Sequence, residues 1–232
     1  TLIGHELFHP CCEEFTDQHR NDIAYNITKM VETQFPDDFN SGDLFGKRRL
    51  DIVNNYLMDM WKRALHEIMC DMFCTAIFGP AALLAMRAYA SFTELKTMPG
   101  PENNFYPPLQ YRFETVWKYA IDMDALGKLC IGDNEVIKAF ASEINNFGAF
   151  LESDNGFKCV SNDLLCKIAY NEVNNLIPNA YKYVKSKLPA TISKWSDEKV
   201  LKQIPKLVDR LQNWIPPNEI PNISFNQAEK KG

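Results

Sequence analysis

Apolar side chains recur every three or four residues along most of the chain, and the strict alternation typical of strands is scarce. In the first such segment, one stripe consists of Ile23, Ile27, Met30 and Val31. The same periodicity predicts helices over residues 13–34, 48–78, 81–95, 109–129, 134–151, 162–188 and 196–214. We therefore expect a mainly α-helical protein.

Proline and glycine mark the expected interruptions of these helices. Gly79–Pro80 separates the second helix from the third, because a proline ring clashes with the preceding helical turn. For the same reason we expect Pro178 to kink or split the helix over 162–188, and Pro205 to shift the start of the last helix. Ser196 is the predicted N-cap of that helix. The proline pair at 216–217 ends it, and the polar tail beyond is expected to be extended.

Composition places the chain among globular proteins. It has 232 residues, of which 46% are hydrophobic and 24% charged. We expect a helical core over residues 1–130 and a C-terminal helical region over 131–232, packed on the same domain. The net charge of -5 argues against a nucleic-acid partner, because binding to phosphates needs a basic excess.

Two further patterns concern membranes and cellular compartment. The longest apolar run covers only residues 81–86, far short of the roughly 20 residues of a membrane span, so no membrane association is expected. Seven cysteines, an odd number without a CxxC pair, favour reduced thiols and a cytoplasmic location.

The first motif that indicates a chemical function is HExxH, in residues His5-Glu6-Leu7-Phe8-His9. On a helix the two histidines lie on one face, about 5–6 Å apart, and can bind one Zn²⁺. Glu6 then lies beside a zinc-bound water and can take its proton as a general base.

A second motif lies on the predicted helix over 48–78. One face of that helix carries apolar or small residues with two carboxylates, Glu67 and Asp71, in the middle. Two carboxylates on adjacent turns of a buried face repel each other and are costly to desolvate. A cation near them relieves both problems, although a surface salt bridge from Arg63 to Glu67 is the simpler alternative.

Together, HExxH and the later Glu67-Ile68-Met69-Cys70-Asp71 resemble the gluzincin metallopeptidases, whose pattern is HExxH followed by ExxxD. The resemblance implies His5, His9 and Glu67 as zinc ligands, Glu6 as general base, and Asp71 as the acceptor of a hydrogen bond from His5. It also implies a multi-helix zincin-like domain that hydrolyses peptide or protein substrates. Because the chain opens at Thr1, we expect upstream sequence, including the sheet that precedes the motif in zincins.

A further resemblance covers residues 67–81, EIMCDMFCTAIFGPA, with Tyr106-Pro107-Pro108 and Arg112 downstream. This string is similar to a group of largely uncharacterised bacterial proteins. Tyr106 or Arg112 would donate a hydrogen bond to an oxyanion, or serve only in packing beside the Pro-Pro turn.

Other interpretations remain open at this point. His66 points about 100° away from Glu67 around the helix, which favours a core or surface role. A thiolate from Cys11 or Cys12 would instead complete a structural zinc site. A separate alternative is a non-catalytic helical interaction or regulatory domain, with or without a structural zinc. The sequence leaves oligomeric state, substrate and cleavage preference undetermined.

Overall fold

The computed structural model describes residues 2–39, 44–90, 100–129, 134–153 and 163–213. These residues form eight α-helices and one short 3-10 helix, which confirms the predicted helical class. The elements are α1 (Leu2–Gln34), α2 (Leu44–Phe78), α3 (Pro80–Ala90), η1 (Pro101–Asn103), α4 (Leu109–Ala120), α5 (Met123–Leu129), α6 (Glu135–Ser153), α7 (Leu164–Lys187) and α8 (Glu198–Gln212). Among the described helices, none combines the length and apolar character that crossing a bilayer requires.

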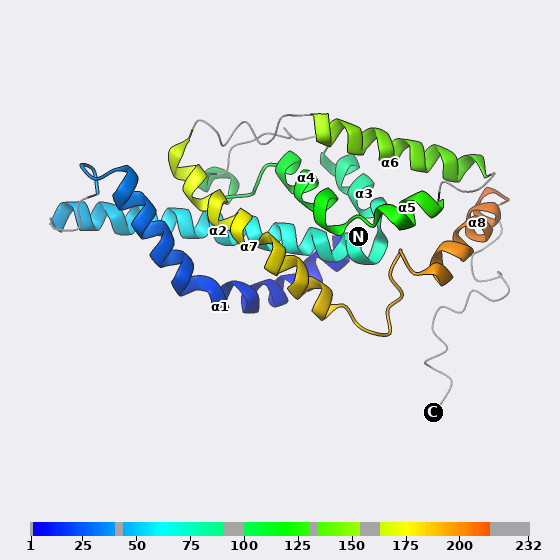
Figure 1. Cartoon of the computed structure of the whole chain (residues 1–232), viewed down its shortest axis with the longest axis horizontal. Coiled ribbons are helices and arrows are strands. Elements are labelled where there is room, and N and C mark those ends of the chain that lie inside the picture. Colours follow the sequence, from blue (N-terminus) through cyan, green and yellow to red (C-terminus); the bar gives the residue numbers. More distant parts are fainter. Residues whose placement is uncertain (1, 40–43, 91–99, 130–133, 154–162, 214–232) are drawn as a thin grey trace, which may run out of the picture.

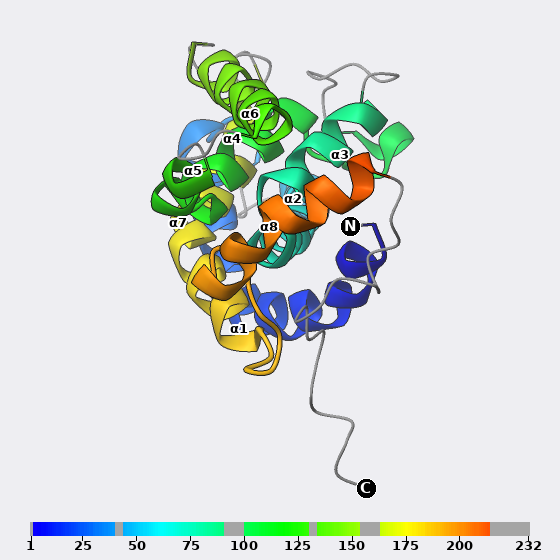
Figure 2. The same ribbon diagram turned by 90° about the vertical axis from the view of Figure 1, so that its right-hand side faces the viewer.

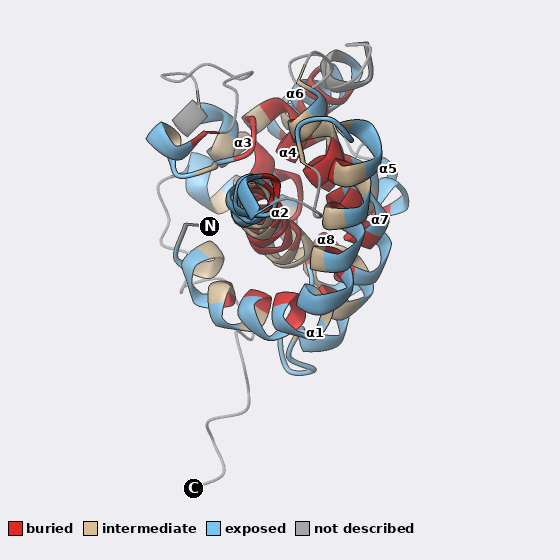
Figure 3. Ribbon diagram, turned by 90° about the vertical axis from the view of Figure 1, so that its left-hand side faces the viewer, coloured by how far each residue is buried: buried red, intermediate tan, exposed pale blue. Residues whose placement is uncertain are grey.

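Helix α2 runs through the middle of the molecule, and the other helices surround it (Figures 1, 2 and 3). Helices α1, α3, α4 and α7 all pack directly against it. Its residues from Met60 to Thr75 are almost all buried, as the red ribbon at the centre of Figure 3 shows. Glu67 and Asp71 of α2 therefore lie inside the helical assembly.

Helices on both sides of residue 130 contribute to one hydrophobic cluster. Helix α7 packs on α1, α2 and α4, and its buried Ile168 and Val173 belong to the same cluster as Trp61 of α2. Helix α6 packs on α4 and α5, and α8 packs on α5 and α6. The division into regions 1–130 and 131–232 stays a prediction.

The first helix begins earlier than predicted, because it includes the HExxH motif and continues through Pro10 to Gln34. Helices α7 and α8 likewise run through Pro178 and Pro205 without a break. A proline inside a helix removes one hydrogen bond and costs roughly 3 kcal/mol. In α1, burial of Phe8 and Cys12 on either side of Pro10 offsets that cost.

Two further expectations about helix boundaries were wrong. The predicted helix over 109–129 is two helices, because the carboxylate of Asp122 accepts a hydrogen bond from the backbone N–H of Ala125 at 3.0 Å and starts α5. The last helix is capped by Asp197 and not by Ser196, since Asp197 accepts from the N–H of Lys199 at 2.9 Å. The end of the predicted helix over 81–95 and the tail from 214 lie outside the described residues.

The predicted break at Gly79–Pro80 is present and fixes where α2 ends. Gly79 has a φ of 66°, a left-handed conformation that favours glycine, and a Cβ there would overlap the Trp195 indole. The backbone N–H of Trp195 donates to the carbonyl of Ile77 at 3.1 Å. This turn anchors the end of the helix that carries Glu67 and Asp71.

Candidate metal centre

Helices α1 and α2 lie antiparallel, and this arrangement brings the two motifs together. Along α1, successive residues contact earlier and earlier residues of α2. These pairs are His5 with Asp71, Thr16 with His66, and Thr28 with Asn54. The start of α1 therefore lies beside the second half of α2. The HExxH and ExxxD motifs meet there although His5 and Asp71 are 66 residues apart.

The imidazole of His5 lies between the carboxylates of Glu67 and Asp71 on α2. Its Nδ1 lies 2.9 Å from Oδ1 of Asp71, and its Nε2 lies 3.2 Å from Oε2 of Glu67. The His5–Asp71 contact has the geometry that the resemblance to gluzincins implies. Asp71 is fully buried and the Glu67 side chain is 3% exposed, so both carboxylates depend on these partners.

Arg112 of α4 holds the same two carboxylates from the other side. Its Nε and Nη2 donate to Oδ2 and Oδ1 of Asp71 at 2.7 and 2.9 Å, a two-pronged contact. Its Nη1 lies 3.2 Å from Oε2 of Glu67, the oxygen that also faces His5. The Arg112 side chain is only 9% exposed, so this is a buried ion network and not a surface pair.

The pKa values of these groups follow from that network. Burial acts to raise the pKa values of Asp71 and Glu67, but Arg112 and His5 outweigh burial and hold both below their ordinary values. Burial acts to lower the pKa of His5, but Asp71 and Glu67 outweigh it and raise that pKa to about 9. The two negative charges thus have one permanent buried cation, Arg112, and a second positive charge is supplied at His5.

His9 and Glu6 occupy the next positions of the motif on α1. The ring of His9 lies 5.1 Å from that of His5, measured between centroids, as expected for residues four apart on one helix face. Its Nε2 lies 3.8 Å from a carboxylate oxygen of Glu6, whose side chain is 66% exposed. Glu6 is therefore accessible to solvent beside the two histidines.

A cysteine that sequence reasoning did not select also lies at this place. Ligand atoms of His5, His9 and Cys70 all lie within 4.8 Å of one another, a grouping of described residues that does not include Glu67. The Sγ atoms of Cys70 and Cys12 are 3.6 Å apart, and both residues are fully buried. This contact and burial raise the pKa of the Cys70 thiol.

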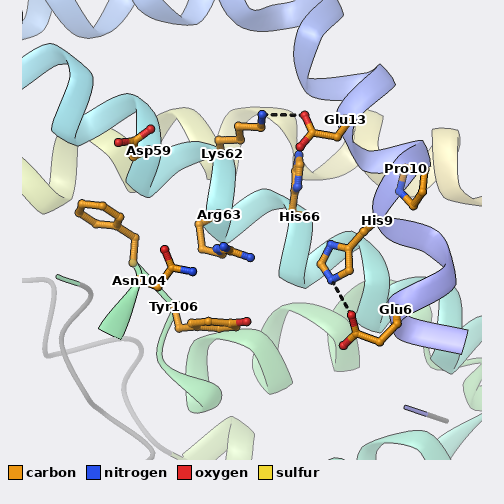
Figure 4. A pocket seen from close by; sticks show the side chains of 11 residues that line it. Glu6, His9, Pro10, Glu13, Asp59, Lys62, Arg63, His66, Asn104 and Tyr106 are labelled. Atoms are coloured by element: carbon orange, nitrogen blue, oxygen red, sulfur yellow. Dashed lines mark ion pairs between the residues drawn. The ribbon is translucent and has the colours of Figure 1, made fainter. Parts of the chain in front are cut away.

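A cleft of about 800 Å³ opens beside the HExxH motif (Figure 4). Most of the residues that line the cleft have polar side chains. They include Glu6, His9, Glu13, Lys62, Arg63 and Tyr106. Glu6 and His9 enter from α1, whereas Lys62 and Arg63 enter from α2, one turn before Glu67. Glu6 and His9 are therefore open to molecules that enter the cleft.

His66 also lines this cleft, although its residue is only 6% exposed. Its Nε2 lies 3.0 Å from the hydroxyl of Thr16, and burial lowers its pKa to about 4. His66 is thus neutral near pH 7. Tyr106 lies across the cleft with its ring under the guanidinium of Arg63.

Of the residues that the sequence singled out, the structure brings His5, Glu67 and Asp71 into direct contact. The Arg63–Glu67 pair considered as an alternative also exists, at 3.4 Å, but Glu67 is buried and has two closer partners. The role of Arg112 as the buried partner of both carboxylates was not foreseen. The sequence had singled out Arg112 only through the resemblance to the bacterial proteins, as a donor to an oxyanion or as a packing residue.

The donor set fits a zinc ion. Two imidazoles, a carboxylate and a thiol are all ligands that Zn²⁺ accepts. Ligand atoms about 2.0–2.2 Å from one tetrahedral zinc lie roughly 3.4 Å apart. The 3.2 Å between Nε2 of His5 and Oε2 of Glu67 is compatible with that separation. The Asp71 contact leaves Nε2 of His5 as its ligand atom.

Comparisons of the chain with protein-family models, with curated proteins and with solved structures found no match. The function of the site must therefore be inferred from its geometry and from the two motifs.

Proposed function

We propose that this chain is a zinc-dependent peptide hydrolase of gluzincin type, with His5, His9 and Glu67 as ligands and Glu6 as general base. One observation carries the proposal. The imidazole of His5 lies between two buried carboxylates, with Nδ1 on Asp71 and Nε2 toward Glu67. This is how a ligating histidine is held when a carboxylate fixes its tautomer and a second carboxylate shares its metal.

Charge balance supports a cation at this place. Asp71 and Glu67 are buried and ionised, and Arg112 neutralises only one of the two charges. In the metal-free chain a proton on His5 supplies the second positive charge. A metal ion would replace that proton, because a ligating imidazole must be neutral. Zinc binding and proton release at His5 are then one event.

Glu67 is a better third ligand than Cys70, although Cys70 lies nearer to His9. The carboxylate is already ionised and its Oε2 already faces the ligand atom of His5. The thiol of Cys70 shares a contact with Cys12 in a buried environment that disfavours the thiolate. We expect Cys70→Ser to retain zinc and Glu67→Ala to lose it.

Zinc held by His5, His9 and Glu67 would supply a Lewis acid that polarises the scissile carbonyl and makes water more acidic. Glu6 is placed to accept a proton from the attacking water, since its carboxylate is exposed at the cleft and lies beside His9. Glu6 then donates that proton to the leaving amine. Asp71 and Arg112 keep the ring of His5 in one orientation throughout.

The proposal is tested by incubating the chain, with zinc, in a mixture of peptides and detecting new termini by mass spectrometry. Glu6→Gln should lose cleavage at least 100-fold, because general-base catalysis contributes roughly 10²–10⁴-fold. The matched control is Glu32→Gln, on the same helix near its other end, which should cleave like the wild type. Cleavage by Glu6→Gln at the wild-type rate would contradict the proposed function.

A further inference from the structure

Arg63 is a charged residue of the cleft that the proposed chemistry does not use. It lies on α2, one turn before Glu67, and its guanidinium points into the cleft (Figure 4). Its side chain is 30% exposed, so the charge is accessible but partly shielded from solvent. In such a place, an ionic contact is worth more than on an open surface.

The contact between Arg63 and Glu67 is weak. Nη1 of Arg63 lies 3.4 Å from Oε1 of Glu67, near the limit for a hydrogen bond. The other oxygen of Glu67 is held by His5 and Arg112, each at 3.2 Å. Glu67 therefore does not depend on Arg63, and an arginine has five N–H donors in all. Most of the donor capacity of Arg63 is available to a ligand.

Tyr106 fixes the position of that guanidinium. The Cζ atom of Arg63 lies 4.9 Å from the centre of the Tyr106 ring, a cation–π contact. Stacking on an aromatic ring limits the freedom of the guanidinium and leaves its N–H edge for planar anions. A preorganised donor edge is what selective binding of a carboxylate requires.

The other residues of the cleft indicate which anion fits. Lys62, the neighbouring cation, is engaged by Glu13 at 2.6 Å. Glu6 and Asp59 add negative charge to the same cleft. These carboxylates disfavour a doubly charged phosphate, whereas a carboxylate carries one charge and matches the planar fork of arginine.

We propose that Arg63, stacked on Tyr106, binds a carboxylate of the peptide that enters the cleft. The ligand is thus a peptide with a free C-terminus or with an acidic side chain near the scissile bond. The inference rests on the proposed function for its peptide substrate, but the binding step does not need hydrolysis.

The test measures binding to the Glu6→Gln chain, which keeps Arg63 but should not cleave. The probes are three eight-residue peptide mixtures: one with a free C-terminus and no acidic side chain, one amidated and without acids, and one amidated with internal Asp and Glu. Bound peptide is measured by equilibrium dialysis and mass spectrometry. We expect one or both carboxylate-bearing mixtures to bind about 10- to 100-fold more tightly than the amidated mixture without acids. The mixture that binds more tightly identifies the source of the carboxylate.

Two variants assign this preference to Arg63. Arg63→Gln should abolish it, and Arg63→Lys, which keeps the charge without the planar fork, should show an intermediate preference. Lys62→Gln removes the same charge from the same cleft and should change the preference less than about 3-fold, because Lys62 is held by Glu13.

Equal binding of all three mixtures, or no binding, would overturn the inference, as would an unchanged preference in Arg63→Gln and Arg63→Lys. The outcome is separable from the proposed function. Carboxylate-dependent binding without cleavage by the wild type would contradict hydrolysis alone. Cleavage with no carboxylate preference would contradict this inference alone.

Discussion

Replacing Arg112 by glutamine tests the buried ion network on which the site depends. Arg112 makes two contacts with Asp71, at 2.7 and 2.9 Å, and one with Glu67 at 3.2 Å. Asp71 is fully buried, so the substitution leaves a charged carboxylate without its guanidinium. Protonated His5 remains, but its single positive charge cannot neutralise both Glu67 and Asp71.

Breaking a buried pair by removing one partner costs about 3–5 kcal/mol, because the remaining charge stays desolvated. For a chain of this length, each kcal/mol lowers the melting temperature by about 2–4 °C, so we expect a fall of about 6–20 °C. Adding Asp71→Asn to Arg112→Gln should recover part of the loss, because the amide carries no charge.

The assays are urea unfolding and thermal unfolding of the metal-free chain, each followed by circular dichroism of its helices. The matched control is Arg87→Gln, because Arg87 contacts Glu143 at the same 2.7 Å while both side chains are about half exposed. That exposed pair should contribute at most about 1 kcal/mol. An Arg112→Gln loss as small as that of Arg87→Gln would show that the buried network does not form as described.

Two further predictions concern pH and packing. The pKa of His5 is raised to about 9 in the folded metal-free chain from an ordinary 6.5, so its contribution is complete below pH 6.5 and is lost as pH rises through 9. We expect stability to fall by an amount on the order of 3 kcal/mol across that window, measured by urea unfolding with a chelator present, and His5→Gln to lack this component. In α6, Gly148→Ala should destabilise by about 1–3 kcal/mol because the new Cβ would overlap the Trp117 indole, whereas Gly127→Ala in α5 meets no neighbour and should be neutral or stabilising. Equal melting temperatures for these two glycine variants would contradict the packing of α4 against α6.

The helical class could be predicted from sequence, because it depends on local spacing. The meeting of the two motifs was expected only from the resemblance to gluzincins, because they lie on different helices. Periodicity along α2 places Glu67 and Asp71 on the same face as the buried Met60 and Ala64, and the structure buries all four. The spacing within HExxH likewise places His5 and His9 on one face of α1. These are properties of single helices, which the 3.6-residue period fixes.

The wrong expectations concern where helices end or are interrupted, which the local sequence pattern alone does not determine. Pro178 and Pro205 were expected to interrupt or shift helices, but α7 and α8 run through them. In α7, burial of Ile177 and Ala180 on either side of Pro178 offsets the loss of one hydrogen bond. The break at Asp122 depends on a single capping contact that competes with a continuous apolar pattern.

The candidate site was incomplete for the same reason. Arg112 comes from α4 and Cys70 from the face of α2 toward α1, and their proximity to His5 depends on how three helices pack. No local spacing connects residues 5, 70 and 112. Only the arrangement of the helices shows that the carboxylates already have a buried arginine and that a thiol lies near the histidines.

In the proposed site, His5 and Glu67 share a metal ion. The most direct measurement is zinc content per chain by elemental analysis after dialysis, for the wild type and for the His5→Ala/Glu67→Ala double variant. Both chains must first be shown to be helical by circular dichroism. We expect about one zinc per wild-type chain and none in the double variant. A wild type without zinc after incubation with excess metal, or a folded double variant that keeps it, would show that His5 and Glu67 do not share a metal ion.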